Sequence, residues 1–175
     1  MAKAGPTTPG PEEQLGRAGP PEGSDKANVL IRPPMALALA AAGGLAAAWL
    51  YPLPLLPAFI PAGWVGAAVF ALGFALAVWA VATMRRAGTR FETHQPTARI
   101  VTTGPYRFAR NPIYAGMFLA LIGLAIGVDS LWPLVALAVF YLVIRYGVVA
   151  REEAYLERKF GDAYLDYKAR VRRWV

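Results

Sequence analysis

Cysteine is absent from this chain of 175 residues, and His94 is its only histidine. The lack of cysteine excludes disulfide bonds, thiolate metal ligands and a cysteine nucleophile. A single histidine, with no thiolate to join it, argues against a histidine-based metal site. The sequence therefore predicts neither a metal cofactor nor thiol chemistry.

Charged residues are also scarce, at 17% of the chain, whereas hydrophobic residues make up 57% and the mean hydropathy is +0.39. Soluble domains of this size rarely have such a composition, which is typical of small membrane proteins. The net charge of +7 could indicate a nucleic-acid partner. The basic residues, however, flank apolar segments, as they do in membrane proteins. We therefore expect an integral membrane protein whose partner is the lipid bilayer and not nucleic acid.

The first 29 residues differ from the rest of the chain. They are rich in Pro, Gly, Glu and Ala, and no apolar run follows the first methionine. Segments of this composition cannot bury enough apolar surface to offset the entropy of ordering. We predict a disordered tail over residues 1–29 and one integral membrane domain over residues 30–175.

Four apolar segments meet or approach the roughly 20 residues that a helix needs to cross about 30 Å of hydrocarbon. They span residues 35–56, 64–84, 113–128 and 131–149. Residues 151–174 are charged and aromatic with a helical period, interrupted at Gly161, which indicates an amphipathic helical segment at the interface. The sequence predicts an all-α polytopic membrane protein with about four transmembrane helices and this C-terminal segment on the cytoplasmic side.

The third and fourth apolar segments are separated only by Asp129 and Ser130. So short a turn predicts an antiparallel hairpin of closely packed helices. Gly123 and Gly127, on the third segment, have the Gly-x-x-x-Gly spacing that permits close helix approach, and we interpret them as packing residues.

All eighteen Lys and Arg residues lie in three regions: the N-terminal part up to Arg32, the loop at 85–110, and the segment from Arg145 onward. The turns at 51–63 and 128–131 contain none. Because cytoplasmic loops are enriched in Lys and Arg, this distribution predicts both termini in the cytoplasm.

Two polar motifs lie at the two ends of the predicted hairpin. The first, residues 103–116, leads from the basic loop into the third apolar segment, and the second is Arg151-Glu152-Glu153. A hairpin returns the chain to the face it left, so the two motifs are predicted to be neighbours. Asn111-Pro112 also suits a helix start, with Asn as the cap and Pro in the first turn, and this simpler interpretation stays open.

These motifs resemble those of the isoprenylcysteine carboxyl methyltransferase and phospholipid methyltransferase superfamily of integral membrane enzymes. Its members typically carry Gly-x-Tyr-x-x-x-Arg-His-Pro-x-Tyr-x-Gly, then a hydrophobic hairpin, then Glu-Glu-x-x-Leu. The matching positions here run from Gly104 to Gly116 and from Glu152 to Leu156. The resemblance covers about residues 100–174, and Asn111 replaces the histidine. Asn cannot titrate near neutral pH, which excludes proton transfer at this position and leaves a positioning role.

The resemblance implies S-adenosylmethionine as methyl donor, and S-adenosylhomocysteine as product, at the cytoplasmic end of the hairpin. The ligand's cationic groups, carboxylate, ribose and adenine suit carboxylates, arginines and aromatic rings. The residues expected to bind the cofactor are Tyr106, Arg110, Asn111, Tyr114, Gly116, Glu152 and Glu153. Arg107 and Arg173 are the candidate catalytic residues, through contact with the substrate or the cofactor carboxylate.

Three functions remain open at this point. The first is methyl transfer to an amphiphile that enters from the bilayer, such as a phospholipid amine or an isoprenylcysteine-like carboxylate. The second is a sterol-type reductase that uses NADPH, because such enzymes share a similar C-terminal motif. The third is a membrane scaffold or accessory protein without enzymatic activity.

Overall fold

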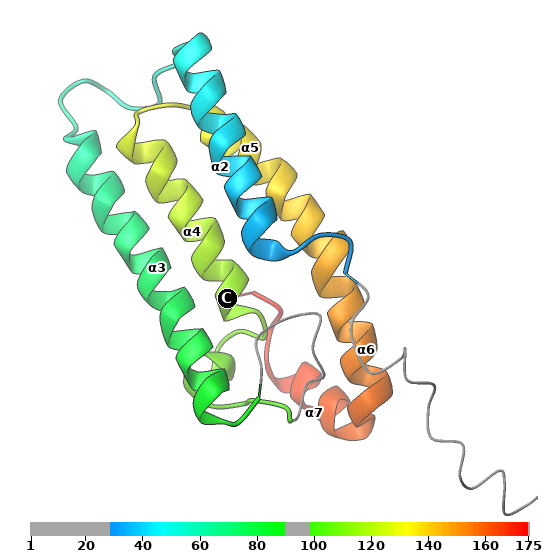
Figure 1. Ribbon diagram of the computed structural model, residues 1–175. Coiled ribbons are helices and arrows are strands. Elements are labelled where there is room, and N and C mark those ends of the chain that lie inside the picture. Colours follow the sequence, from blue (N-terminus) through cyan, green and yellow to red (C-terminus); the bar gives the residue numbers. More distant parts are fainter. Residues whose placement is uncertain (1–28, 90–98, 175) are drawn as a thin grey trace, which may run out of the picture.

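The computed structural model describes residues 29–89 and 99–174, which form a bundle of helices (Figure 1). The described residues contain no β-strand, so the predicted all-α class is confirmed. The long helices are α2 (Pro33–Leu50), α3 (Ala62–Arg86), α4 (Pro112–Gly127) and α5 (Trp132–Leu142). A π-helical segment, η2 (Val143–Val149), continues α5 into α6 (Ala150–Phe160), and α7 (Asp162–Arg170) follows.

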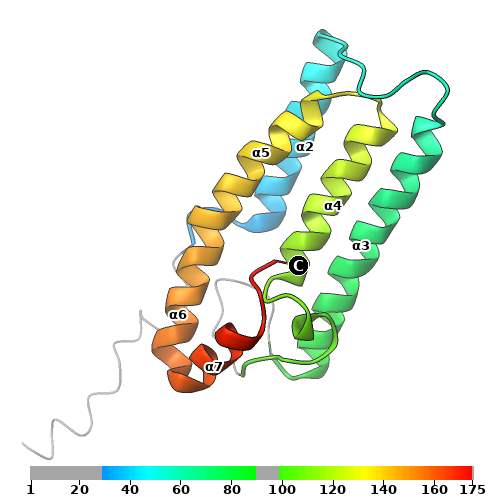
Figure 2. The same ribbon diagram turned by 180° about the vertical axis from the view of Figure 1, so that it is seen from behind.

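Helix α4 lies between α3 on one side and the pair α2 and α5 on the other, as both views of the bundle show (Figures 1 and 2). The most extensive contact is between α3 and α4, and α2 packs along α5. The predicted hairpin of α4 and α5 is present, with a turn at Asp129 and Ser130. Its two helices pack less closely on each other than α4 packs on α3.

Glycines explain why α3 and α4 approach so closely. A Cβ at Gly116 of α4 would lie 2.6 Å from the Gly73 carbonyl oxygen of α3, and a Cβ at Gly73 would lie 2.6 Å from the Ala120 amide nitrogen. Gly123 of α4 likewise faces Gly66 and Phe70 of α3. These glycines therefore serve helix packing, but their partner is α3 and not the hairpin partner α5.

Prolines set the end of α2. The sequence predicted a first apolar helix over residues 35–56, whereas α2 ends at Leu50. Pro52 disfavours helical dihedrals at the residue before it, and Tyr51 has φ −138° and ψ 81°. The predicted end was wrong because the apolar run continues through the prolines, whereas the hydrogen-bonded helix does not.

Within residues 29–89 and 99–174, three helices are long and apolar enough to cross a membrane: Pro33–Leu50, Ala62–Arg86 and the continuous helix Trp132–Phe160. Helix α4 is also apolar but has 16 residues, or about 24 Å at 1.5 Å per residue. That is shorter than the roughly 30 Å of hydrocarbon in a typical bilayer. The membrane character is supported, and the count of four crossings stays a prediction.

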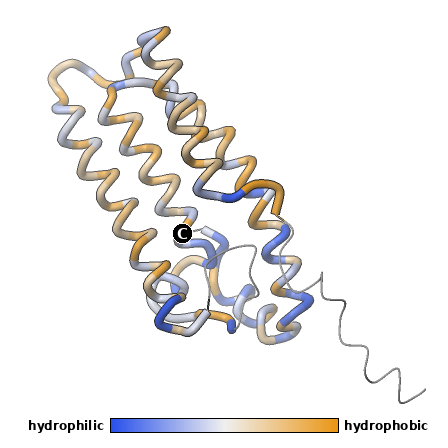
Figure 3. The backbone as a smooth tube through the Cα atoms, viewed as in Figure 1, coloured by the Kyte–Doolittle hydropathy of each residue, from blue (hydrophilic) through white to orange (hydrophobic). Residues whose placement is uncertain are grey.

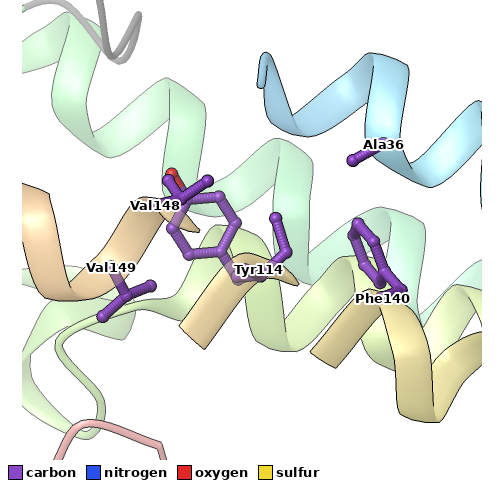
Figure 4. Packing of buried hydrophobic residues seen from close by; sticks show 6 residues of the cluster. Ala36, Tyr114, Phe140, Val148 and Val149 are labelled. Carbon is purple, nitrogen blue, oxygen red and sulfur yellow. The ribbon is translucent and has the colours of Figure 1, made fainter. Parts of the chain in front are cut away.

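Polar residues gather at one end of the bundle, around α6, α7 and the loop before α4 (Figure 3). We call this the polar end. Just inside it, a hydrophobic cluster joins α2, α4, α5 and η2, and Tyr114 lies within it beside Val148 and Val149 (Figure 4). Val29 packs against this cluster, although it was assigned to the tail, and the rest of the predicted disordered tail lies outside the described residues.

Candidate functional site

The two polar motifs meet at the polar end. Pro112 occupies the first turn of α4, and Tyr114 follows with its side chain buried. The Tyr114 Oη donates a hydrogen bond of 2.9 Å to Oε1 of Glu152 on α6. The helix runs without a break from Trp132 to Phe160, so Glu152 does not lie at a free helix start. The predicted proximity of the two motifs is therefore observed.

The neighbouring carboxylate, Glu153, is held by two arginines. Arg173 binds it through both oxygens, with Nε 3.0 Å from Oε1 and Nη2 2.6 Å from Oε2. Arg110 places Nη2 3.1 Å from Oε1, and the side chains of Arg110 and Glu153 are only 8% and 7% exposed. Charge-assisted hydrogen bonds of this kind offset the cost of burying the charges. Glu153 also raises the pKa of Arg173, chiefly through the hydrogen bond to its guanidinium group.

The chain after α7 closes this cluster. Gly161, with φ +53°, adopts a left-handed conformation that lets α7 fold back from α6. The segment after α7 then runs beside the start of α4, where the Arg110 amide donates to the Arg172 carbonyl oxygen at 2.9 Å. The predicted C-terminal helix is thus confirmed only as far as Arg170, because Val171 is extended.

Asn111 contributes to the same closure. It occupies the cap position of α4, but its side chain makes no capping hydrogen bond. Its Nδ2 instead donates to the Arg173 carbonyl oxygen at 3.3 Å. The helix-start interpretation therefore explains where Asn111 sits, and the side chain tethers the C-terminal segment.

Tyr106 lies in the short 3-10 helix η1 (Gly104–Arg107) and is buried. Its carbonyl oxygen accepts a 2.7 Å hydrogen bond from the Tyr167 Oη of α7. Burial raises the pKa of the Tyr106 hydroxyl, with smaller contributions from Tyr167 and Glu152. Burial also raises the pKa of Tyr167 to about 12, against the opposing effect of Arg110. Both tyrosines therefore stay neutral hydrogen-bonding groups at physiological pH.

Three buried polar atoms among the described side chains have no hydrogen-bond partner: Tyr106 Oη, Arg110 Nε and Trp174 Nε1. All three belong to the polar end. The Trp174 ring packs against Phe118 and Tyr141, with ring centroids 5.2 Å and 5.9 Å away. Buried polar atoms are rarely left unpaired without a reason. Two donors, a hydroxyl, an aromatic wall and the Glu152 carboxylate together suit a polar organic ligand with an aromatic part.

Two predicted site residues lie outside this cluster. Arg107 is exposed, and its guanidinium carbon lies 5.0 Å from the ring centroid of Phe108. Gly116 faces α3 and contacts Gly73 and Ala77. Gly116 was expected to bind the cofactor, but its α carbon faces α3. Neither residue is therefore part of the buried cluster.

Sequence reasoning missed the contributions of Tyr167 and Trp174. Tyr167 lies in the segment interpreted as amphipathic and was not among the expected site residues, whereas its hydroxyl donates a hydrogen bond to the η1 backbone. Trp174 was given no role of its own, although its ring joins the aromatic cluster with Phe118 and Tyr141. The three-residue spacing of Tyr164 and Tyr167 was the available signal, because it places both on the buried side of α7.

The fold and the site define a class of protein: an all-helical membrane protein with a buried cluster of Tyr, Arg and Glu at one end of its bundle. Its sequence matches the phospholipid methyltransferase family over residues 61–163, more than half of the chain. The chain belongs to this family of membrane methyltransferases. The match includes Tyr106, Arg110, Tyr114, Glu152 and Glu153.

Two relatives add detail. An uncharacterized protein of Haemophilus influenzae is 40% identical over 63 residues, which are 36% of this chain and the whole of that protein. The nickel-cobalt-cadmium resistance protein NccN of Alcaligenes xylosoxydans xylosoxydans is 28% identical over 108 residues, which are 62% of this chain and 50% of that protein. This chain therefore spans about half the length of the second relative.

Proposed function

We propose that this protein is an S-adenosylmethionine-dependent methyltransferase that modifies an amphiphile at the cytoplasmic face of the membrane. The observation that carries the proposal is the set of three unpaired buried polar atoms, Tyr106 Oη, Arg110 Nε and Trp174 Nε1. The Glu152 carboxylate, bound by Tyr114, adds an acceptor. Membership of a membrane methyltransferase family supports the reaction class. The distribution of Lys and Arg supports the cytoplasmic orientation.

Residues of different charge suit different parts of the cofactor. Among the described residues Glu152 accepts from the neutral Tyr114 hydroxyl through one oxygen, and its second oxygen suits a ribose hydroxyl or an ammonium group. Arg110 and the Tyr106 hydroxyl suit a carboxylate, and Trp174 offers an aromatic face for adenine. Glu153 holds Arg110 and Arg173 in place rather than facing a ligand.

When bound, S-adenosylmethionine supplies a methyl group on a positively charged sulfur, so in-line displacement needs no covalent protein nucleophile. The protein's part is to align the acceptor and to exclude water. Tyr114 and Asn111 are positioning groups, because Tyr114 orients Glu152 and Asn111 tethers the closing segment. A carboxylate acceptor needs no general base, whereas an amine must arrive deprotonated.

Binding of S-adenosylhomocysteine to the detergent-solubilised protein, measured by calorimetry, tests the proposal. Glu152→Gln should weaken binding by about tenfold or more, because a hydrogen bond to a charged group contributes roughly 1.5–3 kcal/mol. Glu157→Gln is the matched control on the same helix, since Glu157 pairs with Lys168 at the surface. We expect that variant to bind like the unmodified protein.

Failure of the unmodified protein to bind S-adenosylhomocysteine at high micromolar concentration would refute the proposal. Binding of NADPH in its place would favour the reductase, and binding of neither would favour a scaffold. Transfer of a labelled methyl group into a total lipid extract, followed by head-group analysis, identifies the acceptor.

The name of the NccN relative concerns metal resistance, but the described residues contain no group of three His, Cys, Asp or Glu that could hold a metal ion.

A further inference from the structure

A groove of about 930 Å³ opens in the side of the bundle, between α2 and α3. This volume is at the upper end of the roughly 300–1,000 Å³ typical of small-molecule sites. Most of its lining is apolar and comes from three helices, including Met35 of α2, Val78 and Val81 of α3, and Met117 of α4. Two of the three helices that line the groove, α2 and α3, are long and apolar enough to cross a membrane.

The groove has a charged rim. Among the residues that the structure describes, the charged ones that line the groove are Arg32, just before α2, and Arg85 and Arg86, at the end of α3. All three are exposed, and Arg32 and Arg86 come from opposite sides of the groove. An apolar channel that ends between arginines is complementary to a molecule with a hydrocarbon tail and a negative head group.

Tyr114 connects the groove to the candidate site. Its side chain lines the groove, while its hydroxyl binds Glu152 at 2.9 Å. Ile113 also lines the groove and packs against the cluster around Tyr106. Tyr114 therefore belongs both to the groove and to the candidate site.

We propose that the groove binds the hydrocarbon chain of an amphiphile with an anionic head group, which Arg32 and Arg86 select. The groove as a binding site does not depend on the reaction. The identification of its occupant as the methyl acceptor rests on the proposed function. A neutral lipophile then binds poorly, because it leaves the arginines without an anionic partner.

Binding of radiolabelled 1-myristoyl lysophosphatidylglycerol to the purified protein in maltoside detergent tests this proposal. Uncharged monomyristoylglycerol and tail-free glycerol 3-phosphate serve as competitors. We expect the anionic probe to bind at least tenfold more tightly than either competitor. The double variant Arg32→Gln/Arg86→Gln should lose about tenfold in affinity for the anionic probe and none for monomyristoylglycerol. Val78→Trp, which fills the groove, should weaken both.

Matched controls carry the same changes away from the groove. Arg158→Gln/Arg170→Gln removes two exposed arginines at the polar end, and Leu72→Trp adds a ring on the exposed face of α3. Both should bind the anionic probe like the unmodified protein. Equal affinity for the charged and uncharged probes, or a Val78→Trp variant that binds normally, would overturn the proposal.

Calorimetry with S-adenosylhomocysteine on the same preparations separates the two proposals. Anionic-probe binding without S-adenosylhomocysteine binding supports the groove and refutes the methyltransferase. S-adenosylhomocysteine binding without selective probe binding supports the methyltransferase and refutes the groove as an anionic-amphiphile site. A dimer that forms with rising protein concentration and blocks the probe would show that a second copy of the chain covers the groove. That result would also refute the proposed amphiphile site.

Discussion

Glu152 and Glu153 are adjacent in the sequence but differ in their surroundings. Glu153 is buried and forms ion pairs with two guanidinium groups, so its charge is balanced within the protein. Glu152 receives one hydrogen bond, from the neutral Tyr114 hydroxyl. A buried carboxylate favours a cationic or hydroxyl partner. At the residue scale, the two glutamates therefore have different roles: Glu153 holds the structure together, and Glu152 remains suited to a ligand.

Arg173→Gln tests the structural half of that distinction. It removes the two-point contact with Glu153 and should lower the free energy of unfolding by about 2 kcal/mol, because charged hydrogen bonds contribute roughly 1.5–3 kcal/mol. Arg172→Gln is the matched control, since the Arg172 side chain is exposed and only its backbone carbonyl contacts Arg110. The measurement is the thermal unfolding midpoint in one detergent. Equal midpoints for the two variants would contradict the assignment.

At the scale of single elements, the π-helical segment η2 (Val143–Val149) precedes the two glutamates directly. A π-helix holds more residues per turn than an α-helix and often occurs at functional sites. The side chains that follow it are therefore rotated relative to an unbroken α-helix, which affects the direction of Glu152. The Gly147 carbonyl oxygen in this segment accepts a 3.1 Å hydrogen bond from the Leu30 amide, which fixes the chain before α2.

The α3–α4 contact gives a second element-scale prediction. Gly73→Ala places a methyl group against the α4 backbone and should destabilise the protein by about 1–3 kcal/mol, the usual cost of overpacking. Gly63→Ala, on the same helix, meets nothing within 4 Å and should be neutral or slightly stabilising. Thermal unfolding in the same detergent compares the two. A Gly73→Ala variant as stable as Gly63→Ala would show that the helices separate easily.

At the scale of the whole molecule, the loop after α2 and the α4–α5 turn lie together at the end opposite the polar end. Asp129 Oδ1 accepts hydrogen bonds from the Leu55 and Leu56 amides at 3.0 Å and 2.8 Å. Neither loop contains Lys or Arg. The proposed topology places this end outside the cytoplasm, with the polar end inside.

The absence of cysteine makes this topology easy to test. Single variants Ala58→Cys, in the loop after α2, and Asp162→Cys, at the start of α7, can be labelled with a membrane-impermeant maleimide. Both positions are exposed. We expect Ala58→Cys to react in intact cells and Asp162→Cys to react only after permeabilisation. The opposite pattern would reverse the orientation, and labelling of both in intact cells would contradict an even number of crossings.

The sequence determined the class of fold and most of the proposed site. Apolar length predicted membrane helices, and the short turn at Asp129 predicted that Tyr114 and Glu152 would meet, because a hairpin constrains its two ends locally. The end of α2 was the exception: the apolar run continues through the prolines, so the sequence did not predict that the helix ends at Leu50. These features depend on neighbouring residues, so a pattern along the chain is enough to predict them.

Only the tertiary structure decided which surfaces meet. Helix α4 is apolar all around, so its sequence has no preferred face and does not indicate whether Gly116 faces a ligand or another helix. The pairing of Arg173 with Glu153 depends on how α7 folds back, and the groove depends on the separation of α2 from α3. Contacts between distant segments follow from the packing of the whole bundle, and no local pattern encodes them.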